Sequence, residues 1–397
     1  MGRSFGGSVL KIGIDKMSFF TSDLYLPMED LAKARNEDPN KYLIGIGQSK
    51  QAVIRNSQDS VTLAANAALK IVDDSEKEKI DLILFGTESG VDSSKSGAIY
   101  LQSLLGINSA ASGVELKQAC FGLTAGIQMA MGHIALHPES RVLLVGSDIA
   151  RYGIGTLGEK TQGGGAMAMI MSANPHLLEI GTESAHLTKD IMDFWRPLNR
   201  SEALVDGKYS SEEFINFFKE TFENYIEKEN ESIANFAAII FHLPYTKMGL
   251  KALRSVIEDL EDQKVKERLL ERFEESRYLN REVGNLYTGS LYLSLLSLLH
   301  AHSLKAGEQI GLFSYGSGAE GEFFTGRVVE GYEKYITDET VAFLERRTPV
   351  SVTEYERIYR SFMEPQIDDC ETEFEKDPAP FILKGQKQQQ RIYEKQQ

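Results

Sequence analysis

Short apolar runs that end in glycine or polar residues alternate along the chain with longer segments in which apolar residues recur at helical spacing. The first pattern is typical of buried strands, and the second is typical of helices with one buried face. Their alternation predicts an α/β fold. The clearest predicted strands are 81–85, 141–145, 166–171, 236–241 and 309–315. The clearest predicted helices are 60–71, 95–105, 121–136 and 246–258, followed by a charge-dense, solvent-facing helix within 258–275.

The pattern divides the chain near 175–205, where strand-like runs give way to a polar segment. We expect an N-terminal half at 11–175 and a C-terminal half at 176–383, each built of strand–loop–helix units. Residues 1–10 begin with the glycine- and serine-rich MGRSFGGSV and are expected to be an added leader. The tail 384–397, KGQKQQQRIYEKQQ, is polar and low in complexity, so we expect it to be disordered.

Composition narrows the class of protein. The chain has 397 residues, of which 42% are hydrophobic and 25% charged, enough for a sizeable core in one large domain or two joined halves. A net charge of −15 argues against nucleic acid or an anionic membrane as the main partner. The longest apolar run, 291–299, is short for a membrane span. Two cysteines give no disulfide framework, which fits a reducing compartment, so we expect a cytoplasmic protein.

Cys120 is the first candidate for chemistry. It stands in LKQACFGLTAG, where a loop opens a predicted helix. The unpaired N–H groups at a helix start favour a thiolate, which would make Cys120 a nucleophile. A small buried cysteine packed beside glycines is the alternative. The other cysteine, Cys370, lies among carboxylates that oppose a thiolate, and we interpret it as incidental.

Three polar residues next to predicted strands or helices could join that cysteine. Glu88 follows a strongly apolar strand, where partial desolvation would raise its pKa and suit it to acid–base work; a hydrogen-bonded loop carboxylate is the alternative. His242 ends another apolar strand and is either a substrate-binding group or a structural histidine. Asn285 precedes a helix rich in serine and leucine, where it either points into a site or caps the helix.

Two further features fit a site for an anionic ligand. Lys247, Lys251 and Arg254 share one face of a predicted helix, either as a solvated charged face or as a grip for phosphates. Ser317 lies in Gly-Ser-Gly between two apolar runs, where the backbone can approach a ligand and offer an N–H to an oxyanion. The same tripeptide also occurs in many ordinary tight turns.

Taken together, these segments resemble the 3-hydroxy-3-methylglutaryl-CoA (HMG-CoA) synthases, in their bacterial mevalonate-pathway form, within the thiolase-like superfamily. The similarity runs from about Lys11 to at least Val329, and we find no clear family motif after Tyr332. The joint order and spacing of the motifs makes the resemblance specific. The matching stretches are IGIDKMSFF, YLIGIGQ, FGTESGVDSSKS, ACFG, GSDIARYG, TQGGGAMAM, DFWRP, VDGKYS, FHLPYTKMG, GNLYTGSLY and FSYGSGAEGEFF.

The resemblance implies a thiolase-like fold, with two similar α/β halves in a five-layered α-β-α-β-α arrangement, and a homodimer. It implies no metal or organic cofactor, because acetyl-CoA and acetoacetyl-CoA are substrates. Cys120 would accept the acetyl group as a thioester, and Glu88 would remove a methyl proton from it. His242 would bind and polarise acetoacetyl-CoA, whose ketone carbon is attacked. Water would then release HMG-CoA from the cysteine.

The resemblance also implies binding roles. The backbone N–H groups of Cys120 and Ser317 match the family's oxyanion site, and Asn285 matches an amide that contacts the acyl thioester. Lys247 and Lys251 match positions near the phosphates and pantetheine of CoA. Four more residues lie in motifs around the acyl and pantetheine tunnel: Tyr152, Thr161, Trp195 and Ser210.

Other activities remain open at this point. Cysteine, histidine and asparagine also suit a ketoacyl synthase that extends acyl-carrier protein, but such enzymes gain their carbanion by decarboxylation and have less need of Glu88. A polyketide β-branching synthase would perform the same aldol addition on a carrier-bound ketone. A non-catalytic thiolase-like protein that binds acyl-CoA or serves as a subunit partner is a third possibility, and acetylation of Cys120 would distinguish it.

Overall fold

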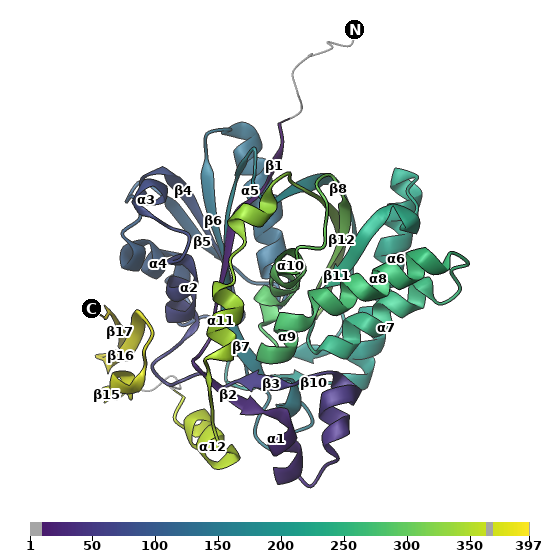
Figure 1. Ribbon diagram of the computed structural model, residues 1–397. Coiled ribbons are helices and arrows are strands. Elements are labelled where there is room, and N and C mark those ends of the chain that lie inside the picture. Colours follow the sequence, from purple (N-terminus) through teal and green to yellow (C-terminus); the bar gives the residue numbers. More distant parts are fainter. Residues whose placement is uncertain (1–9, 363–367, 397) are drawn as a thin grey trace.

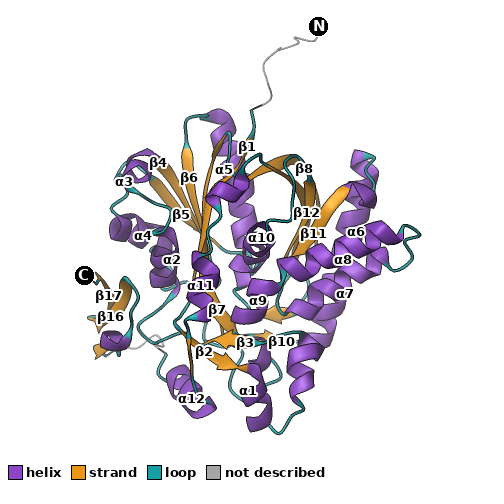
Figure 2. Cartoon of the chain, in the orientation of Figure 1, coloured by secondary structure: helices purple, strands orange, loops and turns teal. Residues whose placement is uncertain are grey.

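The structure, a computed structural model, describes residues 10–362 and 368–396, so the leader expected at 1–10 lies almost wholly outside the described residues (Figure 1). A nine-stranded sheet forms the centre, with helices around it (Figure 2). The strand order is β11-β12-β13-β8-β1-β7-β6-β4-β5. In chain order these strands are β1 (Ile12–Phe20), β4 (Ile80–Gly86), β5 (Ser112–Leu116), β6 (Arg141–Ala150), β7 (Gly163–Ala173), β8 (Leu178–Thr188), β11 (Phe236–Phe241), β12 (Gln309–Gly316) and β13 (Glu320–Val328).

The sheet consists of two parts with the same topology. In the first, β4 runs parallel to β6, β6 antiparallel to β7, and β7 antiparallel to β1. In the second, β11 runs parallel to β12, β12 antiparallel to β13, and β13 antiparallel to β8. The parts join where Gly13 and Ile14 of β1 pair with Glu179 and Leu178 of β8. Strand β5 is an extra edge on the first part.

Helices form three layers around these two half-sheets. Helices α2 (Ser60–Ala68) and α4 (Gly97–Leu105) cover the outer face of the first, and α6 (Gly207–Glu229) and α7 (Thr246–Ile257) cover the second. Helices α5 (Gly122–Leu136) and α10 (Ser290–His300) lie between them. A hydroxyl of α5, Thr124, bonds both Tyr292 of α10 and Ser314 of β12 at 2.7 Å. The arrangement is the α-β-α-β-α layering of the thiolase-like fold.

The two central helices differ from the outer ones in composition. Helix α10 is buried on every side except at its last residue, as expected for a helix that is apolar all round. Its serines bond backbone carbonyls, such as Ser294 to Phe241 and Ser297 to Glu275. By length and composition, residues 119–136, which include α5, could cross a membrane. In the structure, this segment packs between the two half-sheets, as a core helix does.

The predicted elements are present, with shifted ends. The predicted strands 141–145 and 166–171 extend to Ala150 and to Gly163–Ala173. The predicted helix 60–71 stops at Ala68, and the helix predicted from 95 starts at Gly97, capped by Ser96. The charge-dense stretch contains α8 (Gln263–Ser276), which packs on β11 and α10.

Smaller elements complete the fold. They are β2 (Leu24–Pro27), α1 (Met28–Ala34), a π-helix (Lys41–Ile46), β3 (Lys50–Ala52), α3 (Asp74–Lys79), β9 (Phe194–Trp195), β10 (Leu204–Val205), α9 (Tyr278–Val283), α11 (Glu339–Glu345), β14 (Thr348–Pro349), α12 (Val352–Arg360), β15 (Cys370–Glu371), β16 (Phe381–Lys387) and β17 (Gln390–Lys395), with short 3₁₀ turns at Glu159–Thr161, Ile233–Asn235, Tyr287–Gly289, Tyr332–Tyr335 and Phe374–Lys376.

The prediction of a disordered tail at 384–397 is wrong for most of that segment. Residues 384–396 complete β16 and form β17, two strands of a small antiparallel sheet. Arg391 and Tyr393 each reach one carboxylate oxygen of the buried Asp59 at 2.7 Å. Local composition missed this because the stabilising partner lies more than 300 positions away in the sequence.

Candidate active site

Glu88 and Cys120 meet at one end of the first half-sheet. Strand β4 ends at Gly86, and the chain continues through Thr87 to Glu88. Gly86 lets the start of α5 pack closely, since a Cβ there would lie 2.8 Å from the nitrogen of Leu123. The Cys120 Sγ therefore lies 3.1 Å from Glu88 Oε1, within hydrogen-bonding distance. The structure brings together two of the three predicted catalytic residues.

The loop before α5 holds the cysteine in a constrained backbone. Ala119, directly before it, has φ of 42°, a left-handed conformation that costs free energy in a residue other than glycine. The phenylalanine after the cysteine caps the helix with its N–H bonded to the carbonyl of Gln118 at 2.9 Å. This turn presents the Cys120 side chain at the helix start.

Burial shifts the pKa of both groups upward. Desolvation, and then the charge of Asp148, raise the pKa of Glu88 to about 8, although its hydrogen bond with Cys120 works in the opposite direction. Burial and the nearby Glu88 raise the pKa of the Cys120 thiol. Both side chains keep a partial opening to solvent, but dense protein surrounds them. The predicted thiolate is therefore wrong for the ligand-free protein: desolvation and a carboxylate outweigh the helix start.

A buried aspartate, Asp148 of β6, ties the Glu88 segment to the central helix layer. One of its carboxylate oxygens accepts from the Glu88 N–H at 2.8 Å and from the Thr87 hydroxyl at 3.0 Å. The other accepts from the N–H of Thr288 at 3.1 Å and from its hydroxyl. Asp148 was not among the predicted site residues, although a charged residue near the end of the strand RVLLVGSDIA was a visible signal.

Asn285 and Tyr152 also lie together. The Asn285 amide donates to the Tyr152 hydroxyl at 3.3 Å, while its oxygen accepts from the N–H of Tyr287 at 2.8 Å and from the hydroxyl of Ser290 at 3.0 Å. Asn285 thus has both predicted features, a local capping role and a side chain that reaches toward the site. Burial raises the pKa of Tyr152, and the charges of Cys120 and Glu88 raise it further.

Three aromatic rings form a wall beside these groups. Tyr152, Phe194 and Tyr287 contact one another edge to face, with centroids 5.7 to 6.1 Å apart. The predicted residue of this segment was Trp195, which is half-buried in the short strand β9. Because successive strand side chains point to opposite faces, its neighbour Phe194 supplies the ring that joins the cluster.

The loop after β12 packs directly on the cysteine loop. A Cβ on Gly316 would lie 2.5 Å from the carbonyl oxygen of Gln118, so only glycine allows this approach. Asp193, fully buried and not predicted, accepts from the Gly318 N–H at 2.9 Å and from the Ser210 hydroxyl at 3.0 Å. The predicted Ser317 therefore lies in a loop held against the loop of Cys120, and Ser210 helps to hold it.

His242 stands apart from this network. It follows β11, its N–H bonds the carbonyl of Phe313 at 2.9 Å, and its ring is buried near Phe214. Its Nδ1 has no hydrogen-bond partner in the described part of the chain. Desolvation lowers its pKa to about 3, so the imidazole is neutral at physiological pH. Among the described residues, neither its backbone hydrogen bond nor its ring contact involves Cys120 or Glu88.

The predicted binding residues occupy varied positions. Lys247 is half-buried and Lys251 exposed on α7, which begins four residues after His242, and neither forms an ion pair within the described residues. The Thr161 hydroxyl bonds the carbonyl of Gly158 at 2.9 Å, closing its own turn.

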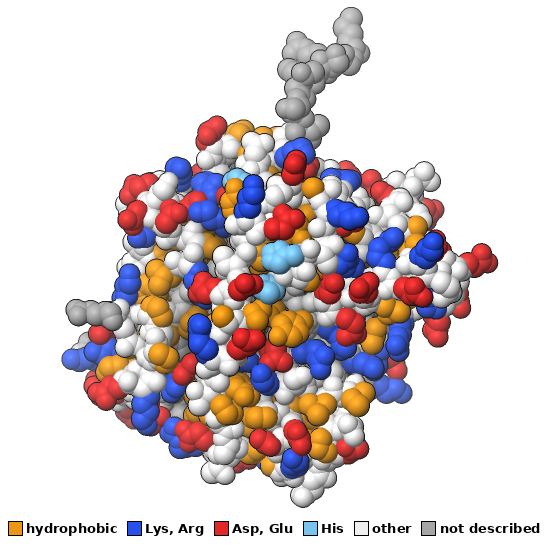
Figure 3. All heavy atoms as spheres, in the orientation of Figure 1, with side chains coloured by type: hydrophobic (Ala, Val, Ile, Leu, Met, Phe, Trp, Pro, Cys, Tyr) orange, Lys and Arg blue, Asp and Glu red, His pale blue; other side chains and the backbone are white. Residues whose placement is uncertain are grey.

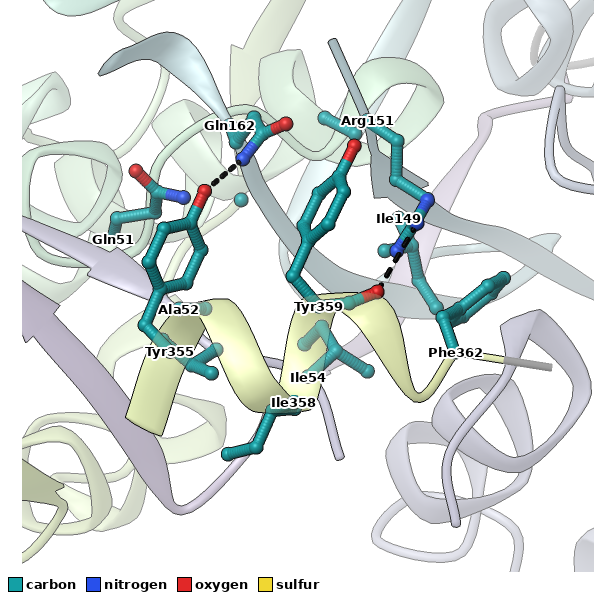
Figure 4. A pocket seen from close by; sticks show the side chains of 13 residues that line it. Gln51, Ala52, Ile54, Ile149, Arg151, Gln162, Tyr355, Ile358, Tyr359 and Phe362 are labelled. Carbon is teal, nitrogen blue, oxygen red and sulfur yellow. Dashed lines mark hydrogen bonds between the residues drawn. The ribbon is translucent and has the colours of Figure 1, made fainter. Parts of the chain in front are cut away.

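Two cavities lie away from the cysteine. One, of about 30 Å³, lies between α12 and the segment 149–163 (Figure 4). Another, of about 410 Å³, lies beside Arg151 and Glu202. Neither contains Cys120, so hydrogen-bond geometry rather than cavity size defines this site. Within 10–362 and 368–396, no group of three or more metal-ligating side chains occurs.

The chain matches two family models. The model described as hydroxymethylglutaryl-coenzyme A synthase N terminal matches residues 9–176, and the C-terminal model matches 177–268 and 257–362. The hydroxymethylglutaryl-CoA synthase of Enterococcus faecalis is 49% identical over 90% of this chain and 94% of its own length. The polyketide biosynthesis 3-hydroxy-3-methylglutaryl-ACP synthase PksG of Bacillus subtilis is 28% identical over 97% of this chain and 96% of its own length.

Solved structures agree with these matches. An HMG-CoA synthase complexed with CoA superposes with a TM-score of 0.94 at 43% identity, covering 97% of this chain and 100% of that chain. MvaS in complex with 3-hydroxy-3-methylglutaryl coenzyme A superposes with a TM-score of 0.88 at 34% identity, covering 98% and 100%. The chain therefore belongs to the hydroxymethylglutaryl-CoA synthase family, the enzymes that condense acetyl-CoA with acetoacetyl-CoA.

Proposed function

We propose that Cys120, Glu88 and His242 carry out the family reaction in this chain, with free acetoacetyl-CoA as the acceptor. The reaction condenses acetyl-CoA with acetoacetyl-CoA and water to give HMG-CoA and CoA, a step of the mevalonate pathway. The observation that carries the assignment of roles is the 3.1 Å approach of Cys120 Sγ to Glu88 Oε1. A nucleophile and a base that act on the same acetyl group must lie this close together.

In the first step, Cys120 Sγ attacks the thioester carbonyl of acetyl-CoA. A new S–C bond forms, the bond to the CoA sulfur breaks, and the thiol proton ends on the departing CoA. The backbone N–H groups of Cys120 and Ser317 are the proposed donors to the oxyanion. The packing of Gly316 on the cysteine loop supports this pairing, because it holds the two loops side by side.

Acetylation prepares the base for the second step. The Cys120 thiol donates to Glu88 and thereby lowers the pKa of that carboxyl. Acetylation removes the thiol proton, so Glu88 loses this donor and becomes a stronger base beside the acetyl methyl group. It takes a methyl proton, and the resulting carbon attacks the ketone of acetoacetyl-CoA. The proton on Glu88 then passes to the new alkoxide, and water releases HMG-CoA from Cys120.

His242 serves the acceptor in this scheme. A neutral imidazole donates a hydrogen bond without carrying charge, and its low pKa keeps it neutral. The ketone oxygen of acetoacetyl-CoA would receive that bond and become more electrophilic at carbon. Its buried Nδ1 has no hydrogen-bond partner among the described residues, so this atom is not held by a second side chain as it would be in a Cys–His pair.

The acceptor is assigned to CoA rather than to a carrier protein for two reasons. Lys247 and Lys251 follow His242 on one helix face and are free to meet phosphates. The chain is also 49% identical to an HMG-CoA synthase but 28% identical to an ACP-dependent relative.

The face shown in Figure 3 mixes acidic and basic side chains, which fits a small-molecule partner better than nucleic acid.

A homodimer and a cytoplasmic location belong to the same proposal. Strand β5 is a sheet edge, and three apolar side chains on and near it are exposed by 44 to 54%: Ile99, Val114 and Met129. An unpaired edge with apolar side chains is suited to pairing with a second copy. Val114→Asp should therefore yield monomers by light scattering, and an unchanged dimer would exclude this face.

The test of the function is thiol release from acetyl-CoA, with and without acetoacetyl-CoA, alongside intact-protein mass. An acetyl adduct that depends on Cys120, followed by HMG-CoA formation, is the expected result. Acetylation without turnover on free acetoacetyl-CoA would instead assign a carrier-bound ketone. Absence of any adduct would refute the mechanism.

A further inference from the structure

The segment that carries Tyr152 is anchored by one buried amide. The Gln162 Oε1 accepts from the N–H of Tyr152 at 2.8 Å and from the N–H of Gly153 at 3.2 Å. Gln162 is 2% exposed. A single side-chain oxygen therefore fixes the backbone from which the Tyr152 ring extends toward Asn285.

The orientation of that amide depends on Tyr355, a residue of α12. The Gln162 Nε2 donates to the Tyr355 hydroxyl at 2.7 Å (Figure 4). The Tyr355 hydroxyl gives its own proton to Glu159 Oε1 at 3.2 Å. The hydroxyl oxygen can therefore only accept a hydrogen bond from Gln162, so the NH₂ group of the amide, rather than its oxygen, must face Tyr355. A half-turn of the amide would point NH₂ at the two backbone N–H groups, which need an acceptor.

Glu159 is itself fixed in place. It is 3% exposed, and Arg35 forms a bidentate pair with it at 2.7 and 2.8 Å. The same guanidinium reaches Glu356 of α12 at 2.8 Å. A bidentate pair defines direction as well as distance, so the proton acceptor for Tyr355 is well placed. The relay thus joins α12, near the end of the region that the C-terminal family model matches, to the wall of the site.

We propose that Tyr355 is a positioning residue for the condensation, acting through Gln162 to set the Tyr152 backbone and ring against Asn285 and the acyl group on Cys120. The proposal rests on the proposed function, because it takes Tyr152 as part of the acyl site. Without the Tyr355 hydroxyl, the buried Gln162 NH₂ group loses its acceptor, and only the two backbone N–H groups still hold the amide. The Tyr152 backbone would then be held less firmly while the fold persists.

The chain provides a matched control on the same helix. Tyr359 lies one turn after Tyr355, and its hydroxyl donates to Glu202 at 2.9 Å. Its ring stacks on the Arg151 guanidinium at 3.8 Å (Figure 4). Tyr359→Phe removes one hydroxyl from the same helix and leaves the hydrogen bonds of Gln162 in place, although the Tyr359 hydroxyl also interacts with the backbone N–H of Gly153. It therefore measures what a lost α12 hydroxyl does to the fold when the Tyr152 amide keeps its acceptor.

The experiment compares kcat of Tyr355→Phe and Tyr359→Phe. Each value is divided by the amount of protein whose Cys120 can be acetylated, which corrects for unfolded protein. We expect Tyr355→Phe to lower kcat about ten-fold with little change in KM, since a displaced positioning group costs rate. Tyr359→Phe should stay within about two-fold of the wild type. In a double-mutant cycle with Gln162→Met, the Tyr355 effect should largely vanish. Equal kcat in the two tyrosine variants, or additive effects with Gln162→Met, would overturn the proposal.

Hydrogen exchange separates this proposal from the proposed function. The amide of Tyr152 should exchange faster in Tyr355→Phe than in Tyr359→Phe, whatever the reaction turns out to be. Faster exchange with no acetylation in the wild type would keep the relay and refute the function. Unchanged exchange with normal acetylation would refute the relay alone.

Discussion

The two half-sheets have the same topology but very different chemical surroundings. Strands β4 and β11 occupy equivalent places, and the chain leaves them toward Glu88 and His242, respectively. Helices α5 and α10 are also equivalent, since each precedes the strand parallel to β4 or β11. Cys120 precedes α5, and Asn285 precedes α10. One architecture therefore positions a thiol and a carboxylate in the first half, and an amide and an imidazole in the second.

Burial acts with opposite sign on the two strand-end residues. Both lose solvation, which always disfavours the charged form. For Glu88 this raises the pKa to about 8, and for His242 it lowers the pKa to about 3. The first half gains a base stronger than an ordinary carboxylate, and the second gains a neutral hydrogen-bond donor. A repeated scaffold thus yields two different functional groups because the residue type, and not the topology, sets the direction of the shift.

The largest expected effect comes from substituting the residues that precede the two central helices. Cys120→Ser should abolish the acetyl adduct and lower turnover by at least about 10³-fold, because the nucleophile is lost. Asn285→Ala should lower turnover by roughly 10–10²-fold while acetylation persists. Intact-protein mass and HMG-CoA formation measure both effects. Cys370→Ser, which changes the other cysteine, serves as the control and should behave as wild type.

The strand-end residues should separate the two half-reactions. Glu88→Gln should lower condensation by about 10²–10⁴-fold and leave acetylation within a small factor, because the base acts after the acetyl group is bound. His242→Ala should chiefly weaken the use of acetoacetyl-CoA. Single-turnover assays starting from acetyl-enzyme distinguish these results. Loss of acetylation in Glu88→Gln with normal condensation would reverse the assigned roles.

The dependence of stability on pH should differ in sign between the two halves. Between about pH 4.5 and 8, folded Glu88 keeps a proton that the unfolded chain has lost, so wild-type stability falls as pH rises. Between about pH 6.5 and 3, folded His242 lacks a proton that the unfolded chain holds, so stability falls as pH falls. Urea unfolding should show Glu88→Gln gaining over wild type toward pH 8, and His242→Gln gaining toward pH 4. Parallel profiles would contradict the opposite shifts.

The smallest expected effect concerns the contact between the β16–β17 hairpin and Asp59 on the first half of the molecule. The β16–β17 hairpin holds Asp59, which caps α2 on the outer face of the first half-sheet. Arg391→Ala should lower the free energy of unfolding by about 1–3 kcal/mol, because it leaves a buried carboxylate with one partner fewer. Lys384→Ala removes a more exposed ion pair in the same hairpin and should cost at most about 1 kcal/mol. Equal losses in the two variants would show that Asp59 is not the anchor.

Much of the fold was predictable because apolar periodicity is a local signal. The predicted strands and helices are present, with ends shifted by a few residues. Glu88 and Cys120 were found because each stands where an element begins or ends. The C-terminal hairpin was missed because its own sequence is polar, and its stability comes from Asp59. The thiol pKa was predicted in the wrong direction because a helix start can be recognised in sequence, whereas desolvation cannot.

The sequence by itself determined the α/β class and the order of the elements, and it supplied the candidate reactive groups, since these depend on residue type and on neighbours a few positions away. Only the tertiary structure decided which of these groups meet. It placed Cys120 against Glu88, joined the Glu88 segment to Thr288 through Asp148, and brought α12 to the Tyr152 segment. These contacts span tens to hundreds of positions, and the pKa shifts follow from the burial they create. The physical reason is that hydrogen bonding and desolvation act through space, whereas sequence patterns report only what is adjacent along the chain.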